Sequence, residues 1–224
     1  YQPLDNVYPA QNVLVGTYQG LQKINYVKGQ FVGSERVDGI NETLRFIVVD
    51  NNDNIWASHP YHGVYRIELQ ADRKRVKRTT MFTDKEGLPS KLYNYVYRIK
   101  NRVVVATSNG VFEYDAQQHK FVRFKLFGDA LNGVSVQYLK EDNEGNIWFV
   151  SNKKVGVIDF SKPKGDKPFN IFYLPELDGK VVGGCESIYA LDHQNIFIGA
   201  NKGAYHINYN KYISAFSSRS IKKK

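Results

Sequence analysis

The chain has 224 residues, of which 42% are hydrophobic and 24% are charged, and its mean hydropathy is −0.46. This length can bury a sizeable core, and no run of 18 apolar residues predicts a membrane span, so the disulfide-stapled, disordered and membrane-spanning classes are excluded. Because it has 16 Tyr and 13 Phe against a single Met, the composition favours strands over helices and predicts an all-β protein.

The formal net charge of +9 is concentrated in two short segments. Five cations lie in 73–78 and four in 219–224, and without these nine the chain carries 22 basic and 22 acidic residues. A nucleic-acid-binding protein spreads its cations over a face and places stacking aromatic residues among them. We therefore interpret the two clusters as a solvated turn and a chain end, and expect no nucleic-acid partner. The single cysteine, Cys185, excludes an internal disulfide framework.

A polar residue, three mostly apolar residues and a small or slim residue recur five times along the chain. The five blocks are 12–16, 54–58, 102–106, 146–150 and 195–199. A short polar link and a second apolar block come after each one, and the residues immediately before the second blocks are Gly20, Gly63, Gly110, Lys154 and Gly203. Their mean spacing of about 46 positions lies within the roughly 40 to 50 residues of a propeller blade. Glycine suits a tight link that needs positive φ, so Lys154 predicts a turn that differs or carries strain.

With one strand expected before each pair of blocks and one after it, the repeat predicts a β-propeller of four-stranded antiparallel blades. The approximate blade bounds are 1–36, 37–83, 84–128, 129–175 and 176–214, with repeats over 1–210 and a basic tail, or the start of a following segment, at 211–224. Such sheets cannot cover both their faces alone, so neighbouring blades must stack face to face. A closed ring of five blades and an arc of a larger, seven-bladed ring both fit the sequence. We expect no substantial helix, because no segment combines a 3.6-residue period with caps.

Trp56 and Trp148 fall at one repeat position, so we interpret both as packing residues. The segments 50–54 and 142–146 resemble the opening of a calcium loop. However, Ile55 and Ile147 stand where the sharp-turn glycine of such a loop belongs. Hairpin turns explain these segments better. We predict neither a metal site nor a cofactor.

The links between the second and third strands of all blades emerge at one end of a propeller. Their side chains are aromatic, amide-bearing or basic, which suits a sugar, particularly an acidic one. The predicted ligand-binding residues are Tyr18, Gln19, His59, Tyr61, His62, Asn109, Asn152, Lys153 and Lys202. The link with His59 and His62 is one residue longer than the others, an insertion of the kind that carries function on a rigid scaffold. No histidine lies in a zinc-binding or nucleophile-elbow pattern, so no residue is predicted to be catalytic.

Three segments carry a resemblance to the two-component regulator propeller repeat. Gly87-Leu88-Pro89-Ser90, just ahead of a strand, resembles the signature between blades of that family. The segment 141–148 resembles its acidic, glycine, asparagine and tryptophan core, and 106–115 is similar to the family's segment on the C-terminal side of that core. The resemblance spans about residues 4 to 210. The first signature degenerates at 39–41 and 183–185, which leaves some blade junctions uncertain.

The resemblance implies a non-catalytic, extracytoplasmic sensor propeller of a hybrid two-component system, located in the periplasm as part of an inner-membrane receptor. It also implies that the chain binds oligosaccharide or polysaccharide fragments and relays a signal, with the rest of the receptor chain and a second copy as partners. This segment itself is expected to make no membrane contact. Two alternatives stay open: a propeller-type lyase with His59 or His62 as general base, and a protein-interaction propeller anchored by exposed Tyr and Arg.

Overall fold

A computed structural model gives the structure of the chain and describes residues 2–3, 12–163 and 165–221. The side chains of residues 12–163 and 165–215 are described. The chain divides into two compact units, Tyr1–Ser135 and Val136–Lys224. Each unit has its own sheets and its own apolar core.

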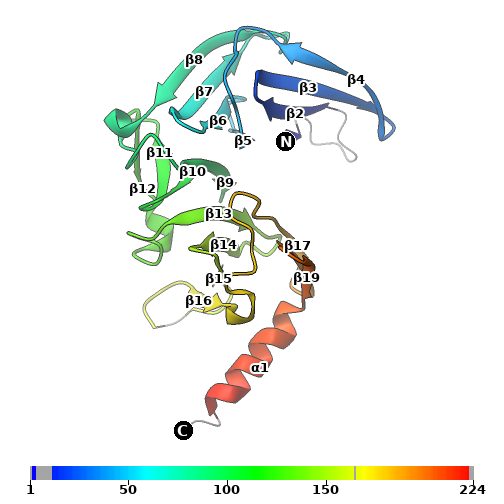
Figure 1. Cartoon of the computed structure of the whole chain (residues 1–224). Helices are drawn as coiled ribbons and strands as arrows, with labels where there is room; N and C mark the ends of the chain where they lie inside the picture. The colour runs from blue at the N-terminus through cyan, green and yellow to red at the C-terminus, as the bar shows by residue number, and fades with distance from the viewer. Residues whose placement is uncertain (1, 4–11, 164, 222–224) are drawn as a thin grey trace. The chain divides into compact units, whose positions relative to one another are not determined.

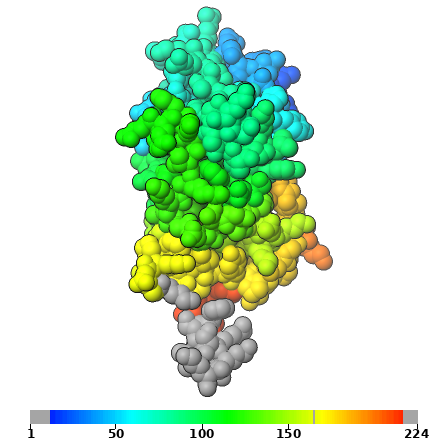
Figure 2. Space-filling model, turned by 90° about the vertical axis from the view of Figure 1, so that its left-hand side faces the viewer, coloured from blue at the N-terminus to red at the C-terminus, as the bar shows by residue number. Residues whose placement is uncertain are grey.

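The first unit holds three antiparallel sheets of four strands, in which each strand pairs with its neighbours in sequence (Figure 1). The first sheet consists of β1 (Gln2–Pro3), β2 (Asn12–Thr17), β3 (Gly20–Val27) and β4 (Gln30–Val37). The second consists of β5 (Ile47–Val49), β6 (Ile55–His59), β7 (Gly63–Leu69) and β8 (Val76–Phe82). The third consists of β9 (Tyr95–Ile99), β10 (Arg102–Thr107), β11 (Gly110–Asp115) and β12 (Lys120–Arg123). Two 3₁₀ turns, η1 (Asp84–Glu86) and η2 (Lys125–Phe127), come after β8 and β12. Figure 2 shows the surface of this unit on the side of β8 and β12, coloured turquoise to green.

The second unit holds a four-stranded sheet, a three-stranded sheet and a helix. The four-stranded sheet consists of β13 (Val136–Glu141), β14 (Ile147–Ser151), β15 (Lys154–Asp159) and β16 (Asn170–Tyr173), and η3 (Pro175–Leu177) comes next. The three-stranded sheet consists of β17 (Ile188–Asp192), β18 (Asn195–Ala200) and β19 (Gly203–Ile207). The five sheets are the blades of an all-β propeller fold, as the repeat predicts, but the fifth has three strands among the described residues rather than the predicted four, because the segment after β19 forms the helix.

Neighbouring blades within a unit bury a shared apolar core between them. Leu21 of the first blade and Ile67 of the second are both fully buried in one cluster. Trp56 of the second blade and Phe121 of the third belong to the next cluster. In the second unit, a further cluster joins the fourth blade, the fifth blade and the helix. The face-to-face stacking predicted for adjacent blades is present within each unit.

Trp56 and Trp148 occupy matching environments in the second and fourth blades. Their exposed fractions are 1% and 0%, which confirms them as packing residues. Each indole N–H donates to the aspartate six positions earlier, Trp56 to Asp50 over 2.8 Å and Trp148 to Asp142 over 3.0 Å. Each aspartate also accepts the backbone N–H groups two and four positions after it. The two segments that resemble calcium loops are therefore hairpin turns whose carboxylates tie the tryptophans in place.

The link between the second and third strands contains positive φ values in every blade, but at different positions. In four blades the residue after the link is a glycine with φ between +90° and +126°: Gly20, Gly63, Gly110 and Gly203. In the fourth blade, where Lys154 replaces glycine, the positive φ moves back to Asn152 (+49°) and Lys153 (+62°). Two consecutive positive φ values are the pattern of a type I′ hairpin turn. The different turn predicted at Lys154 is confirmed.

The helix α1 (Tyr209–Ile221) corrects the expectation that the chain has no substantial helix. Asn208 accepts the backbone N–H of Lys211 through its side chain, which caps the first turn. Tyr209 and Ile213, four positions apart, are 1% and 3% exposed and pack into the core of the second unit. This apolar stripe is too short to show a helical period in the sequence. Within residues 2–3, 12–163 and 165–221, no helix is long and apolar enough to cross a membrane.

Candidate functional site

Two recesses adjoin in the first unit, next to the first two strand links. We name one the tyrosine recess; its volume is about 180 Å³ and it is lined by Arg45, Phe46, Ser58, His59, Pro60, Tyr61, Tyr93, Asn94 and Tyr95. We name the other the Tyr18 recess; its volume is about 270 Å³ and it is lined by Gly16, Thr17, Tyr18, Thr43, Leu44, Arg45 and Phe46. Arg45 and Phe46 belong to both linings, so these two residues form the wall between the recesses.

The wall between the recesses is held by backbone hydrogen bonds to the second blade. The N–H of Arg45 donates to the carbonyl of Ser58, and the N–H of Ser58 donates to the carbonyl of Phe46. The Phe46 ring meets the rings of Tyr95 and Tyr97 at centroid distances of 5.3 and 5.8 Å. These contacts fix one side of the wall, while the Arg45 side chain stays exposed.

The tyrosine recess presents large aromatic side chains to solvent. Tyr61 is 69% exposed and Tyr93 is 63% exposed. Exposed tyrosine rings combine a flat apolar face with a polar hydroxyl, which is the combination that recognises a sugar ring. Tyr93 also has φ of +58°, a strained conformation for a bulky residue, at a cost on the order of 1–3 kcal/mol. Bulky residues rarely adopt this backbone conformation.

Asn94 lines the same recess with an unsatisfied acceptor. The residue is 3% exposed, and its side-chain Nδ2 donates to the carbonyl of Ser90 over 2.9 Å. Its Oδ1 has no hydrogen-bond partner among the described residues. A buried polar atom without a partner costs about 1–3 kcal/mol. This oxygen is shielded from solvent, so a hydroxyl donor in the recess would remove that cost only after a neighbouring side chain shifts to admit it.

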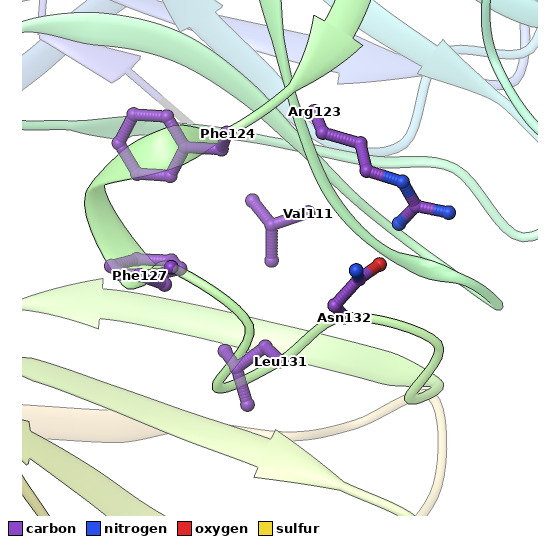
Figure 3. A pocket seen from close by; sticks show the side chains of 7 residues that line it. Val111, Arg123, Phe124, Phe127, Leu131 and Asn132 are labelled. Carbon is purple, nitrogen blue, oxygen red and sulfur yellow. The ribbon is translucent and has the colours of Figure 1, made fainter.

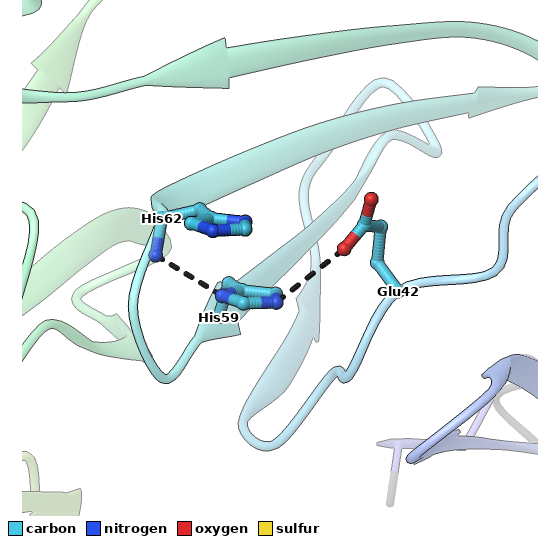
Figure 4. Close-up of side chains that lie close together, drawn as sticks. All are labelled: Glu42, His59 and His62. Atoms are coloured by element: carbon cyan, nitrogen blue, oxygen red, sulfur yellow. Dashed lines mark hydrogen bonds and ion pairs between the residues drawn. The ribbon is translucent and has the colours of Figure 1, made fainter.

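His59 is a buried hydrogen-bonding residue rather than a free loop side chain (Figure 4). It ends β6 and is 7% exposed. Its Nδ1 accepts the backbone N–H groups of Tyr61 and His62, each over 3.0 Å, and so closes the long link. Its Nε2 lies 3.4 Å from the carboxylate of Glu42. Both ring nitrogens therefore face partners within the protein.

Glu42, His59 and His62 bring three potential metal ligands together, with Glu42 as a third group that the sequence did not identify. However, because the Nδ1 of His59 accepts two N–H bonds, a neutral His59 carries its proton on Nε2. The Nε2 of His59 therefore presents an N–H donor to Glu42 and has no free lone pair for a metal ion. The rings of His59 and His62 stack in parallel, with centroids 4.1 Å apart and planes 1° apart. The arrangement fits a hydrogen-bonded stack better than a metal centre.

Burial lowers the pKa of His59, and the nearby charge of His62 lowers it further, while Glu42 acts in the opposite direction. Desolvation disfavours the charged imidazolium, which explains the direction of the shift. His59 is thus kept neutral around neutral pH, the state that its hydrogen bonds require.

The Tyr18 recess is built on the first strand link. The hydroxyl of Thr17 accepts the N–H of Gln19, and Thr43 donates its hydroxyl to the carbonyl of Tyr18 over 3.3 Å. Tyr18 is 87% exposed, so its ring is almost entirely available to a ligand. The N–H of Leu44 donates to the carbonyl of Thr17, which joins this link to the wall segment.

The nine predicted ligand-binding residues all lie on or beside the strand links. Tyr18, His59 and Tyr61 line the two recesses, whereas Gln19 and His62 lie in the same links outside their linings. Asn109 is exposed on the third link, where its carbonyl accepts from Arg123. The remaining three, on links of the second unit, are exposed: Asn152, Lys153 and Lys202.

Most lining residues of the recesses were not predicted from the sequence, and among them are Arg45, Phe46, Tyr93 and Asn94. All four come from irregular segments just before the first strand of a blade, where the repeat pattern carries no information. The signature 87–90 lies just ahead of Tyr93 and Asn94 and is the one sequence feature that points to this region.

Two other hollows differ in kind from the recesses. The one beside Arg123 and Asn132 has about 10 Å³ and is otherwise walled by apolar side chains (Figure 3), which leaves room for about one water molecule. The other, of about 490 Å³, lies in the second unit between β19 and the start of α1. Its lining includes Leu174, Tyr205 and Ile207, so it is mainly apolar.

Comparisons with known proteins support the fold. No family model matches the sequence, and no curated protein matches it. A solved extracellular domain of a protein assigned as a hybrid two-component system of B. thetaiotaomicron matches with a TM-score of 0.58 and 19% identity, covering 91% of this chain and 26% of that one. The extracellular domain of a one-component system of the same bacterium matches with a TM-score of 0.62 and 16% identity, covering 93% and 28%. PorZ, a surface component of the type-IX secretion system of Porphyromonas gingivalis, matches with a TM-score of 0.55 and 13% identity, covering 93% and 32%.

This chain spans about a quarter to a third of the length of these three proteins. Identities below 20% establish a shared architecture rather than a shared activity. The chain therefore has the β-propeller fold, and its structural neighbours include the extracellular domains of bacterial two-component and one-component systems.

Proposed function

We propose that this chain is a non-catalytic sensor propeller that binds an oligosaccharide at the tyrosine recess. In this proposal it lies in the periplasm and is one part of a longer receptor of a hybrid two-component system. Binding relays a signal because the ligand favours one arrangement of the receptor over another, which requires a difference in affinity between the two arrangements.

The buried Oδ1 of Asn94 beside two exposed tyrosine rings is the observation that carries the proposal. A sugar ring offers both groups that this site needs. Its C–H face packs on Tyr61 or Tyr93, and one of its hydroxyls donates to the Oδ1 of Asn94 once a neighbouring side chain moves aside to expose that oxygen. A lining of aromatic side chains with a few placed polar groups is typical of small-ligand sites.

The structural neighbours support the receptor part of the proposal. Two of them are extracellular domains of signalling systems, and this chain covers 28% of their length or less. We therefore propose that further parts of a receptor chain are partners of this propeller. A second copy as a partner rests on the family resemblance alone.

The contacts of His59 argue against this histidine as the general base of a lyase. A general base needs a lone pair that can reach a substrate proton. In His59, Nδ1 is occupied by two backbone N–H groups, and Nε2 faces Glu42. We therefore assign His59 to the architecture of the recess rather than to proton transfer.

A thermal-shift screen against neutral and acidic oligosaccharides tests the proposal. A ligand at 100 times its Kd stabilises the folded state by about 2.7 kcal/mol, and the shift should be lost in Tyr61→Ala or Asn94→Leu. Tyr189→Ala is the matched control, since Tyr189 is 59% exposed and lies in β17 of the second unit. If no oligosaccharide shifts the melting temperature, or if the control loses the shift equally, the proposal fails.

A further inference from the structure

We infer that the two recesses form one extended site for an acidic oligosaccharide of at least two units, whose carboxylate binds Arg45 on the shared wall. The inference rests on the proposed function and adds the charge of the ligand and its minimum length.

The recesses are too small to act singly as ordinary ligand pockets. Their volumes are about 270 and 180 Å³, and both include Arg45 and Phe46 in their linings. Small-molecule pockets usually have about 300 to 1,000 Å³. Taken together, at about 450 Å³, the two recesses reach this range. A ligand that crosses the wall contacts both recesses, whereas a single sugar unit in one recess leaves the other empty.

Arg45 carries a charge that nothing in the described part of the chain neutralises. The one described contact of its guanidinium is with the Phe46 ring, 5.8 Å from the centroid. Two other arginines of the same unit do have acidic partners: Arg66 lies 3.0 Å from Glu68, and Arg102 lies 2.8 Å from Glu113.

Glu42 does not serve as a partner for Arg45, because its carboxylate is directed to His59. An unpaired guanidinium on the wall between two recesses is a site for a carboxylate, which it can bind with two parallel hydrogen bonds. A neutral sugar would leave this donor set unused.

Exposed tyrosines stand on both sides of Arg45. Tyr18 is 87% exposed in one recess and Tyr61 is 69% exposed in the other. One ring on each side of the cation gives a stacking surface to the sugar unit before the bound carboxylate and another to the unit after it. Because a tyrosine ring lies on each side of the Arg45 cation, we expect the affinity to rise with the length of the oligosaccharide.

Isothermal titration calorimetry of the full chain with uronic-acid oligosaccharides tests the inference. The probes are galacturonate and alginate monomers and tetramers, together with methyl-esterified tetragalacturonate, in which the carboxylates are neutral. We expect a tetramer to bind at least tenfold more tightly than its monomer and its methyl ester. Arg45→Gln should weaken tetramer binding at least tenfold and leave the ester unchanged, and Tyr18→Ala should abolish the advantage of the tetramer. Arg78→Gln, an equal charge change at an exposed position of β8, is the control.

Each outcome separates the inference from the function on which it rests. If Arg45→Gln and Arg78→Gln bind the tetramer alike, or if monomer and tetramer bind equally, the inference is wrong. Binding of a neutral oligosaccharide that Tyr61→Ala removes and Arg45→Gln spares would keep the proposed function and overturn the inference. If no oligosaccharide binds at all, both fall. Circular dichroism of each variant verifies that the fold is retained.

Discussion

Trp148 donates its indole N–H to the carboxylate of Asp142 over 3.0 Å, and both residues are buried. Trp56 makes the same bond to Asp50, but Asp50 is only half-buried. The same tryptophan–aspartate hydrogen bond thus occurs at one repeat position in two blades, but the aspartate is more accessible to water in the second blade than in the fourth.

Replacing Trp148 with Phe should destabilise the second unit more than Trp56→Phe destabilises the first. A phenylalanine ring has no N–H, so Trp148→Phe would leave a buried carboxylate short of one donor. The cost is about 1.5–3 kcal/mol for a bond to a charged group, besides the lost ring contacts. Water can replace the indole N–H at Asp50 but not at Asp142. Urea unfolding monitored by far-UV circular dichroism measures both losses, and equal losses in the two variants would contradict this account of the repeat.

Glycine at the first three strand links is required by space as well as by φ. An alanine Cβ at Gly20 would lie 2.3 Å from the carbonyl oxygen of Ile40, at φ of +105°. At Gly133 (φ +71°), the nearest atom would be 4.0 Å away. We expect Gly133→Ala to cost about 1 kcal/mol, as for a left-handed residue alone, and Gly20→Ala to cost clearly more. Thermal denaturation decides this, and a smaller loss at Gly20 would be inconsistent with the packing of the link.

His59 makes the stability of the first unit depend on pH. Since its pKa is lowered in the folded state, the unfolded chain takes up a proton first as the pH falls below about 6.5. Stability is therefore fully present above that pH and declines as the pH falls through the folded pKa. His59→Gln should flatten this decline between pH 6.5 and 5, and His62→Gln should flatten it only in part, because burial of His59 remains. Urea midpoints at three pH values give the test; an unchanged profile in His59→Gln would refute the assignment.

A buried side-chain hydrogen bond helps to tie the helix α1 to the rest of the second unit. Tyr209 donates its hydroxyl to Asp159 over 2.7 Å, and Asp159 is fully buried. Tyr209→Phe should cost about 1.5–3 kcal/mol and speed amide exchange in the first turns of α1. Tyr212→Phe is the matched control, since its bond to Glu176 is exposed. Similar exchange rates in the two variants would show that Tyr209 does not anchor the helix.

The blades could be predicted from the sequence because one polar–apolar pattern recurs at a nearly constant spacing. The residue type at each position of the repeat then predicts its role. Trp56, Trp148 and the turn at Lys154 could be assigned for that reason. The helix could not, because Tyr209 and Ile213 are too few to mark a period. The C-terminal cations thus suggested only a tail.

Only part of the lining of the two recesses could be predicted from the sequence. Tyr18 and Tyr61 lie on the links, whose positions the repeat predicts. Arg45 and Asn94 come from irregular segments, and only the fold brings them beside the links. His59 looked like a loop residue because its link is longer, whereas in the structure its ring is buried and hydrogen-bonded to that same link.

Hydrogen–deuterium exchange of the chain, with and without the oligosaccharide that gives the largest thermal shift, tests the central claim most directly. Binding at the recesses predicts slower exchange in 16–19, 43–46, 58–62 and 93–95, with the rest of the chain unchanged. Slower exchange confined to residues 152–153 and 202, or to the residues that line the hollow between β19 and α1, would place the ligand elsewhere and contradict the account.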